Sequence, residues 1–289
     1  MIVNLLSDEM SIMKHLQFFG NKFVGFVDLG EEEDTSELAA ECLTFMAVAI
    51  NNSWKIPLGY FLIKGLTADQ RVNLVTDCLK KLHDCGVKVT SMTCDGPRVN
   101  LSMLKKLGAD LNPDSINSQI QIRGADKPIH VLLDNCHMLK NCRNAWEAYD
   151  GEFVDGDGGV ISWKYIILLY EFQTNYTFHA GNRLRRDHVY FHNQLMKVSF
   201  AAQTFSRSVA NAIDHCRENL KLPEFKDSGP TSKILRKFDE LFDLCNSSSK
   251  FGKWSKAPLT NLNTGYWKDV FECGKSYILG LHLATGKQN

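Results

Sequence analysis

Two aspartates, Asp8 and Asp95, follow short apolar runs with the composition of β-strands, at residues 2–7 and 87–94. If these strands lie in one sheet, carboxylates at their ends can bind Mg²⁺, which prefers oxygen ligands. Two such ions, about 3.5–4 Å apart, can activate the attacking oxygen and stabilise the leaving oxygen of a phosphodiester. Order and spacing alone leave open the alternative that both residues are ordinary loop acids.

The segments around these aspartates predict the sheet that would bring them together. Strand-forming residues dominate 23–29, 43–50 and 56–63. Thr67 and Gln70 have the spacing of a helix capping box, and the helix they begin is expected to end at Gly86. Its apolar stripe consists of Val72, Val75, Leu79 and Leu82. A second helix is predicted at 101–107. A helix that joins two strands implies a crossover, which favours parallel pairing.

The second half of the sequence has a different pattern. Residues 109–128 are polar and contain two prolines, as a linker or domain edge would. A further strand-like run at 129–133 ends on Asp134. Helical periodicity then dominates 138–149, 162–174, 188–216 and 231–245. The sequence therefore predicts an α/β part followed by a mostly α part.

The composition restricts the class of protein without deciding its function. There are 33 basic and 33 acidic residues, so net charge neither predicts nor excludes a nucleic-acid partner. The compact basic cluster RLRR at 183–186 fits either a DNA-backbone contact or a solvated turn. Nine cysteines without a CxxC pair predict free thiols in a reducing compartment and make a zinc site unexpected. We expect neither a signal peptide nor a membrane-spanning segment.

Several stretches resemble, in order along nearly the whole chain, the P-element-type transposases that are associated with THAP domains. These are DEMS at 8–11, CDG at 94–96 with Asn100, DNCHMLKNCRN at 134–144, KVSFAAQTFS at 197–206 and FDLCNS at 242–247. The resemblance implies an incomplete RNase H-like mixed sheet over 1–115, a linker over 116–128, and an α-helical GTP-binding insertion domain over 129–289.

The resemblance also implies an activity, metal-dependent DNA cleavage and strand transfer with GTP as an assembly cofactor. Asp8 and Asp95 would be the catalytic ligands of Mg²⁺. Transposon-end DNA would be the partner of the full-length protein, with a nuclear location, no membrane and a possible homo-oligomer. The family has a further glutamate in a Gln-Asp-x-Leu-Glu stretch that these 289 residues lack. We therefore expect the chain to be inactive alone.

Two other functions fit the same residues. A domesticated protein could keep the fold and lose the chemistry, acting as a non-catalytic partner of DNA or protein. A metal-dependent nuclease of a different family would need a third acid near Asp8 and Asp95. Silent substitutions of both aspartates would favour the first of these alternatives, and such a third acid would favour the second.

The stretch at 134–144 contains the first candidates for binding a guanine nucleotide. His137, Lys140 and Asn144 lie at three- and four-residue spacing, on one face of an expected helix. A lysine near a helix N-terminus suits a phosphate, because ammonium and backbone N–H groups both favour an anion there. The alternative is that His137 and Asn144 satisfy backbone groups while Lys140 is solvated. The sequence contains no ordinary P-loop motif.

A second set of candidates would recognise the base. A carboxylate that accepts from the N1–H and amine of guanine rejects adenine, whose N1 carries no proton. By resemblance Asp243 is the first choice and Asp134 the second, with Phe242 and Asn246 beside the base. Phe242 also fits an ordinary core position. Lys164 is a further phosphate candidate, or a solvated lysine.

Overall fold

The protein is described by a computed structural model that covers residues 1–20, 22–30, 36–121, 127–148, 151–176, 180–247 and 251–283. The chain forms two compact units, Met1–Asp134 and Asn135–Asn289. Each unit has its own hydrophobic core.

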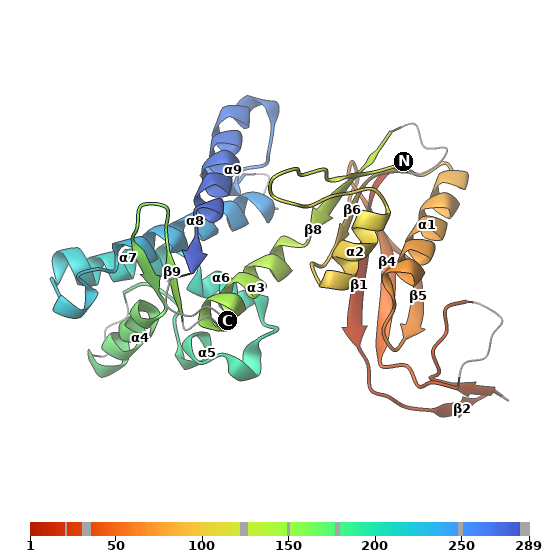
Figure 1. Cartoon of the computed structure of the whole chain (residues 1–289), viewed down its shortest axis with the longest axis horizontal. Coiled ribbons are helices and arrows are strands. Elements are labelled where there is room, and N and C mark those ends of the chain that lie inside the picture. Colours follow the sequence, from red (N-terminus) through yellow and green to blue (C-terminus); the bar gives the residue numbers. More distant parts are fainter. Residues whose placement is uncertain are drawn as a thin grey trace. The chain divides into compact units, whose positions relative to one another are not determined.

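The first unit contains a six-stranded mixed sheet with the strand order β5-β4-β1-β6-β8-β7 (Figure 1). The strands are β1 (Ile2–Ser11), β4 (Glu41–Ala49), β5 (Lys55–Ile63), β6 (Lys88–Cys94), β7 (Gln119–Ile120) and β8 (Ile129–Leu133). β1 pairs antiparallel with β4 and parallel with β6, and β6 pairs parallel with β8. The edge strands β5 and β7 are antiparallel to their neighbours. The expected mixed sheet is confirmed.

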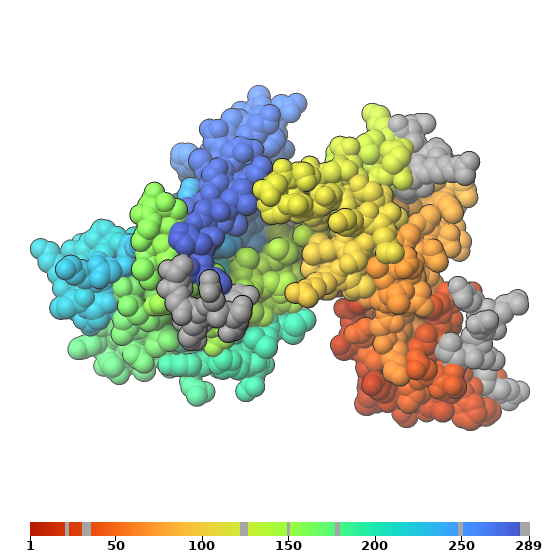
Figure 2. Space-filling view, viewed as in Figure 1, coloured from red at the N-terminus to blue at the C-terminus, as the bar shows by residue number. Residues whose placement is uncertain are grey.

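Two helices, α1 (Ala68–Asp84) and α2 (Arg98–Lys106), pack on one face of this sheet. In the space-filling view their orange and yellow atoms form one continuous surface (Figure 2). The predicted capping box is present, because Thr67 accepts from the N–H of Gln70 and Gln70 accepts from the N–H of Thr67. The buried contacts between sheet and helices come from Leu5, Phe45, Met92, Val75, Leu79, Met103 and Leu104.

The first unit differs from the sequence expectation in three places. The first strand does not end at Ser7 but continues to Ser11, so Asp8 lies inside β1. The run at 23–29 is not a full strand. It forms β3 (Lys22–Val24), which pairs with β2 (Gln17–Phe19), and then two isolated bridges. The run at 129–133 pairs with β6 in the main sheet, so this unit extends to Asp134. Of the expected linker, residues 122–126 lie outside the described residues.

The second unit is mostly helical, as the sequence predicts. Its helices are α3 (Asn135–Ala148), α4 (Lys164–Tyr176), α5 (Arg186–Val189), α6 (Val198–Thr204), α7 (Arg207–Asp214), α8 (Gly229–Cys245) and α9 (Thr264–Leu279). A small sheet joins β9 (Glu152–Val154) to β10 (Val160–Ser162) and β11 (His282–Leu283). The helical pattern at 188–216 is not one helix, because turns at 190–197 and 205–206 interrupt it.

Aromatic side chains form the centre of the second core. Trp146 stacks on Phe205 with ring centroids 5.8 Å apart, and its ring meets Trp163 edge-on at 5.2 Å. The indole N–H of Trp146 donates to the carbonyl oxygen of Gly151 at 2.9 Å. The large buried rings therefore fix α3 against the residues at the start of α4 and at the end of α6. Among the described helices of both units, none is long and apolar enough to cross a membrane.

Candidate metal site and nucleotide-binding residues

Sheet register brings the two aspartates to the same level of neighbouring parallel strands. Ser7 of β1 is the partner of Cys94 of β6, and each aspartate is the next residue along its strand. Side chains alternate between the two faces of a strand. Because Leu5 of β1 is buried under the helices, Asp8 lies on the opposite face of the sheet. The predicted proximity of Asp8 and Asp95 is therefore a consequence of parallel pairing.

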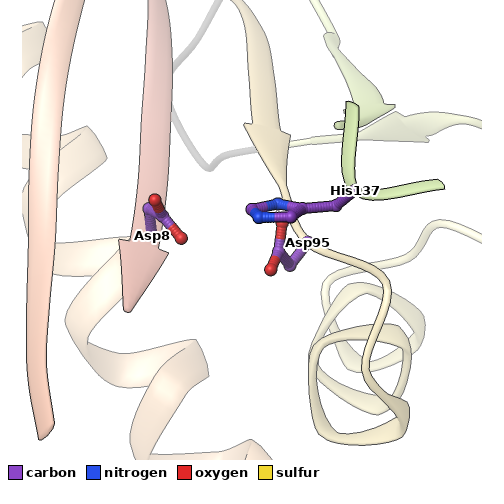
Figure 3. Close-up of side chains that lie close together, drawn as sticks. All are labelled: Asp8, Asp95 and His137. Carbon is purple, nitrogen blue, oxygen red and sulfur yellow. The ribbon is translucent and has the colours of Figure 1, made fainter. Parts of the chain in front are cut away.

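The two carboxylates and the His137 imidazole form a group that could hold a metal ion. One ligand atom from each residue lies within 4.8 Å of the others, and the side chains lie close together in Figure 3. Asp8 is exposed, whereas Asp95 and His137 are partly buried. His137 is in the first turn of α3, three residues after Asp134. The N–H of Asp134 donates to the carbonyl of Cys94 at 3.0 Å, which ties the end of β8 to that of β6.

The donor set fits a hard divalent cation. Two carboxylate oxygens suit Mg²⁺ or Mn²⁺, and an imidazole nitrogen suits a transition metal such as Mn²⁺ better than Mg²⁺. His137 was a nucleotide candidate in the sequence, whereas the structure places it beside Asp8 and Asp95. The sequence signal for this position of His137 is the strand-like run at 129–133. This run joins the same sheet as β8, and His137 follows it by four residues.

The other α3 candidates contact the segment that precedes α6. Lys140 is 5% exposed, and its Nζ lies 3.6 Å from Sδ of Met196. Nδ2 of Asn144 donates to the carbonyl of Leu195 at 3.4 Å. Arg143, which no sequence pattern singles out, is fully buried and donates to backbone carbonyls of the same segment. The structure thus brings Lys140 and Asn144 to one segment.

The base-recognition candidates lie at the C-terminal end of α8 in the second unit. Asp243 lies 3.5 Å from Nζ of Lys256 and accepts from Ser255 at 3.5 Å. Phe242 packs against the aromatic core, and Asn246 is the C-cap residue of the helix.

The remaining two nucleotide candidates belong to other elements. Lys164 begins α4, and its ammonium lies 5.0 Å from the ring centroid of Tyr165. Asp134 directly follows β8 and belongs to the first unit.

The basic cluster at 183–186 borders a cavity of about 350 Å³ in the second unit. Its lining residues are Arg183, Arg185, Asp187, His188, Phe200 and Gln203. Nδ1 of His188 accepts from the N–H of Arg185 at 3.2 Å, so Nε2 carries the proton towards Oε1 of Gln203 at 2.7 Å. Two guanidinium groups and an aromatic ring therefore line one hollow.

Comparison with known proteins agrees with the predicted resemblance. A family model described as TNP-like, RNase H N-terminal domain matches residues 1–108. A second, described as TNP-like, GTP-binding insertion domain, matches residues 136–258. DNA transposase THAP9 of Homo sapiens is 30% identical over 263 residues, which cover 89% of this chain and 29% of that protein.

The fold also has a counterpart among solved structures. The Drosophila P element transposase strand transfer complex matches with a TM-score of 0.75 and 18% sequence identity, over 94% of this chain and 57% of that chain. The structural match supports the fold, and the sequence matches support the family. The chain therefore contains a TNP-like RNase H N-terminal domain followed by a TNP-like GTP-binding insertion domain, and it is a homologue of a DNA transposase over part of that protein's length.

Proposed function

We propose that Asp8 and Asp95 bind a divalent cation as part of the catalytic centre of a DNA transposase. The observation that carries this proposal is their position, because each aspartate is the next residue after Ser7 and Cys94, the last paired residues of the neighbouring parallel strands β1 and β6. His137 would supply a nitrogen ligand from the start of α3. When bound, such a cation polarises a phosphodiester and lowers the pKa of a coordinated water. Asp8 and Asp95 would hold it in place, and Asp8 is accessible to a large substrate because it is exposed.

We further propose that this chain binds the cation but does not cut or join DNA by itself. Within the described residues, the group of possible ligands contains two carboxylates and one imidazole. The family pattern implies an additional glutamate. A cation held by fewer acids has less charge compensation and a less fixed geometry, so it would orient a nucleophile poorly.

Calorimetric titration of the chain with Mg²⁺ and Mn²⁺ tests the metal site. Asp8→Asn or Asp95→Asn should weaken binding by about 100-fold or more, because losing a charged ligand should cost at least as much as the largest effects of groups that only orient ligands. Asp77→Asn is the matched control, because Asp77 is an exposed carboxylate on α1 that pairs with Lys80. Equal cation affinity in the wild type and both aspartate variants would overturn the proposal.

The second unit is proposed to bind a guanine nucleotide, with Lys140 on a phosphate and Asp243 on the base. Buried ammonium groups normally have anionic or strongly polar partners. Within the described chain, the hydrogen-bond partner of Lys140 Nζ is a thioether sulfur, a weak acceptor, so a phosphate would satisfy it better. His137, Asn144, Lys164, Phe242, Asn246 and Asp134 stay secondary candidates.

Titration with GTP and ATP tests the nucleotide proposal. GTP should bind more tightly than ATP, Lys140→Met should weaken both nucleotides, and Asp243→Asn should weaken only GTP. Lys275→Met is the control, because Lys275 is exposed on α9. Equal affinity for GTP and ATP in the wild type would contradict guanine recognition.

Related transposases act on DNA, and from that relation we propose transposon-end DNA as the partner and the nucleus as the location. A possible homo-oligomer and Mg²⁺ as the specific ion belong to the same proposal. If both aspartate substitutions were silent in metal and DNA assays, the non-catalytic interaction protein would be the better description.

A further inference from the structure

Arg71 of α1 is a buried charge beside the proposed metal site. It is 5% exposed, although a guanidinium is costly to remove from water unless it is paired and hydrogen-bonded. Its Nη1 pairs with the Glu9 carboxylate and donates to Oδ1 of Asn100 at 3.0 Å. We propose that Arg71 is a positioning residue that fixes the separation of Asp8 and Asp95, an inference that rests on the proposed metal site.

A series of hydrogen bonds joins the residue next to Asp8 to the backbone of Asp95. Glu9 directly follows Asp8 in β1, and Arg71 joins Glu9 to Asn100. Asn100 is 8% exposed, and its Nδ2 donates to the carbonyl oxygen of Asp95 at 3.2 Å. Three residues from β1, α1 and α2 therefore connect the backbone beside Asp8 to the backbone of Asp95.

This connection begins where the β1–β6 ladder ends. The parallel register stops at Ser7 and Cys94, one residue before the two aspartates. On its other side, Asp8 is still held by pairing with Thr44 of β4. The antiparallel pairing of β1 with β4 therefore holds Asp8 on one side. The distance from Asp8 to Asp95 depends on contacts outside the β1–β6 ladder. Arg71 and Asn100 supply them.

Strand geometry gives the two neighbouring acids different roles. Successive side chains point to opposite faces of a strand, so Glu9 faces the helices where Arg71 lies and Asp8 faces the other side. The Glu9 carboxylate is neutralised by Arg71 and lies away from the proposed cation. The Arg71–Glu9 pair has no net charge, so its effect on a cation at Asp8 and Asp95 is one of geometry.

The experiment measures Mn²⁺ affinity by calorimetry and the Mn²⁺ spectrum by electron paramagnetic resonance. Arg71→Met should weaken Mn²⁺ binding by about tenfold or more, as changes in groups that orient metal ligands do, and should alter the spectrum of the bound ion. The matched control is Lys106→Met. Lys106 pairs with Asp69 at 2.7 Å and so also joins α2 to α1, but on the exposed surface. It should leave affinity and spectrum unchanged.

A second pair of variants keeps the test decisive if Arg71→Met does not fold. Glu9 is partly exposed, so Glu9→Ala should fold and should lose Mn²⁺ affinity by about tenfold. Glu9→Gln keeps an acceptor for Arg71 and should restore wild-type affinity. If Glu9→Gln were as weak as Glu9→Ala, Glu9 would act through its charge, and the positioning role would be overturned.

The results for the wild type and the variants distinguish a failure of the proposed metal site from a failure of the positioning role of Arg71. Absence of Mn²⁺ binding to the wild type would overturn the metal site itself. The inference about Arg71 alone would be overturned if Asp8→Asn strongly weakened Mn²⁺ binding while a folded Arg71→Met, or Glu9→Ala, kept the wild-type affinity and spectrum.

Discussion

The guanidinium of Arg143 donates to the carbonyl oxygen of Leu195 at 2.9 Å, and this bond ties α3 to the segment that precedes α6. Arg143 also donates to the carbonyls of Gln194 and Lys197, and its charge lies 4.1 Å from the ring centroid of Phe191. Burial lowers the pKa of Arg143 to about 10. The segment that contacts Lys140 is therefore held in place by a fully buried cation.

Replacing Arg143 should destabilise the second unit strongly. Arg143→Met removes the donor to three backbone carbonyls and leaves a cavity at a fully buried position, which should lower the free energy of unfolding by about 2–4 kcal/mol. Urea unfolding followed by tryptophan fluorescence measures this, because Trp146 and Trp163 are in the same core. Arg183→Met, at an exposed arginine, should change it by less than about 0.5 kcal/mol. Equal unfolding midpoints for the two variants would contradict the structural role of Arg143.

The capping box at the start of α1 gives a second prediction. Thr67→Ala removes the side-chain acceptor for the N–H of Gln70, and the loss of such a cap lowers stability by about 1 kcal/mol. Thr67→Ser keeps the hydroxyl and should retain most of the stability. Urea unfolding followed by circular dichroism compares the two variants. A serine variant as unstable as the alanine variant would show that the methyl group matters more than the cap.

The buried Cys142 thiol should make the protein less stable as the pH rises into the alkaline range. Burial raises its pKa from 9.0 to about 11, so the folded state keeps a proton that the unfolded chain releases. The unfolded state binds fewer protons between these values, and stability therefore falls as pH rises through them. Between pH 8 and pH 10 the free energy of unfolding of the wild type should fall by about 1.3 kcal/mol more than that of Cys142→Ala. Urea unfolding at both pH values measures the difference. Parallel losses would contradict the raised pKa.

A side chain at Gly151 would cause both backbone strain and steric crowding. Its φ is +69°, and a Cβ would lie 2.7 Å from Cβ of Trp163. Gly151→Ala should lower the free energy of unfolding by about 2–4 kcal/mol, through backbone strain and crowding together. Gly158→Ala is the control, because its φ is +83° with open space around it, so it carries only the strain of about 1 kcal/mol. Similar losses in thermal unfolding would show that crowding at Trp163 is unimportant.

His137 should influence which cation binds. Because imidazole is a better ligand for Mn²⁺ than for Mg²⁺, His137→Ala should weaken Mn²⁺ binding by about tenfold or more and Mg²⁺ binding less. Calorimetric titration with each ion measures the two effects. His130→Ala is the control, since His130 is exposed on β8. An equal loss of both ions would indicate that His137 acts on the fold and not as a ligand.

The sequence by itself determined the features that depend on neighbouring residues. The cap formed by Thr67 and Gln70, the strand-like runs before Asp8 and Asp95 and the helical pattern after Asp134 are local, because side chains three or four residues apart meet on a helix and alternate along a strand. The succession of strands and helices then indicated the fold class, and the family resemblance is confirmed by the sequence matches.

Only the tertiary structure decided which residues meet. The β1–β6 register places Asp8 level with Asp95, and the position of β8 in the same sheet places His137 near them. Arg71 gave no pattern in the sequence, because its partners Glu9 and Asn100 belong to other elements. Strand order and helix packing determine such contacts through interactions between distant parts of the chain, which local spacing does not specify.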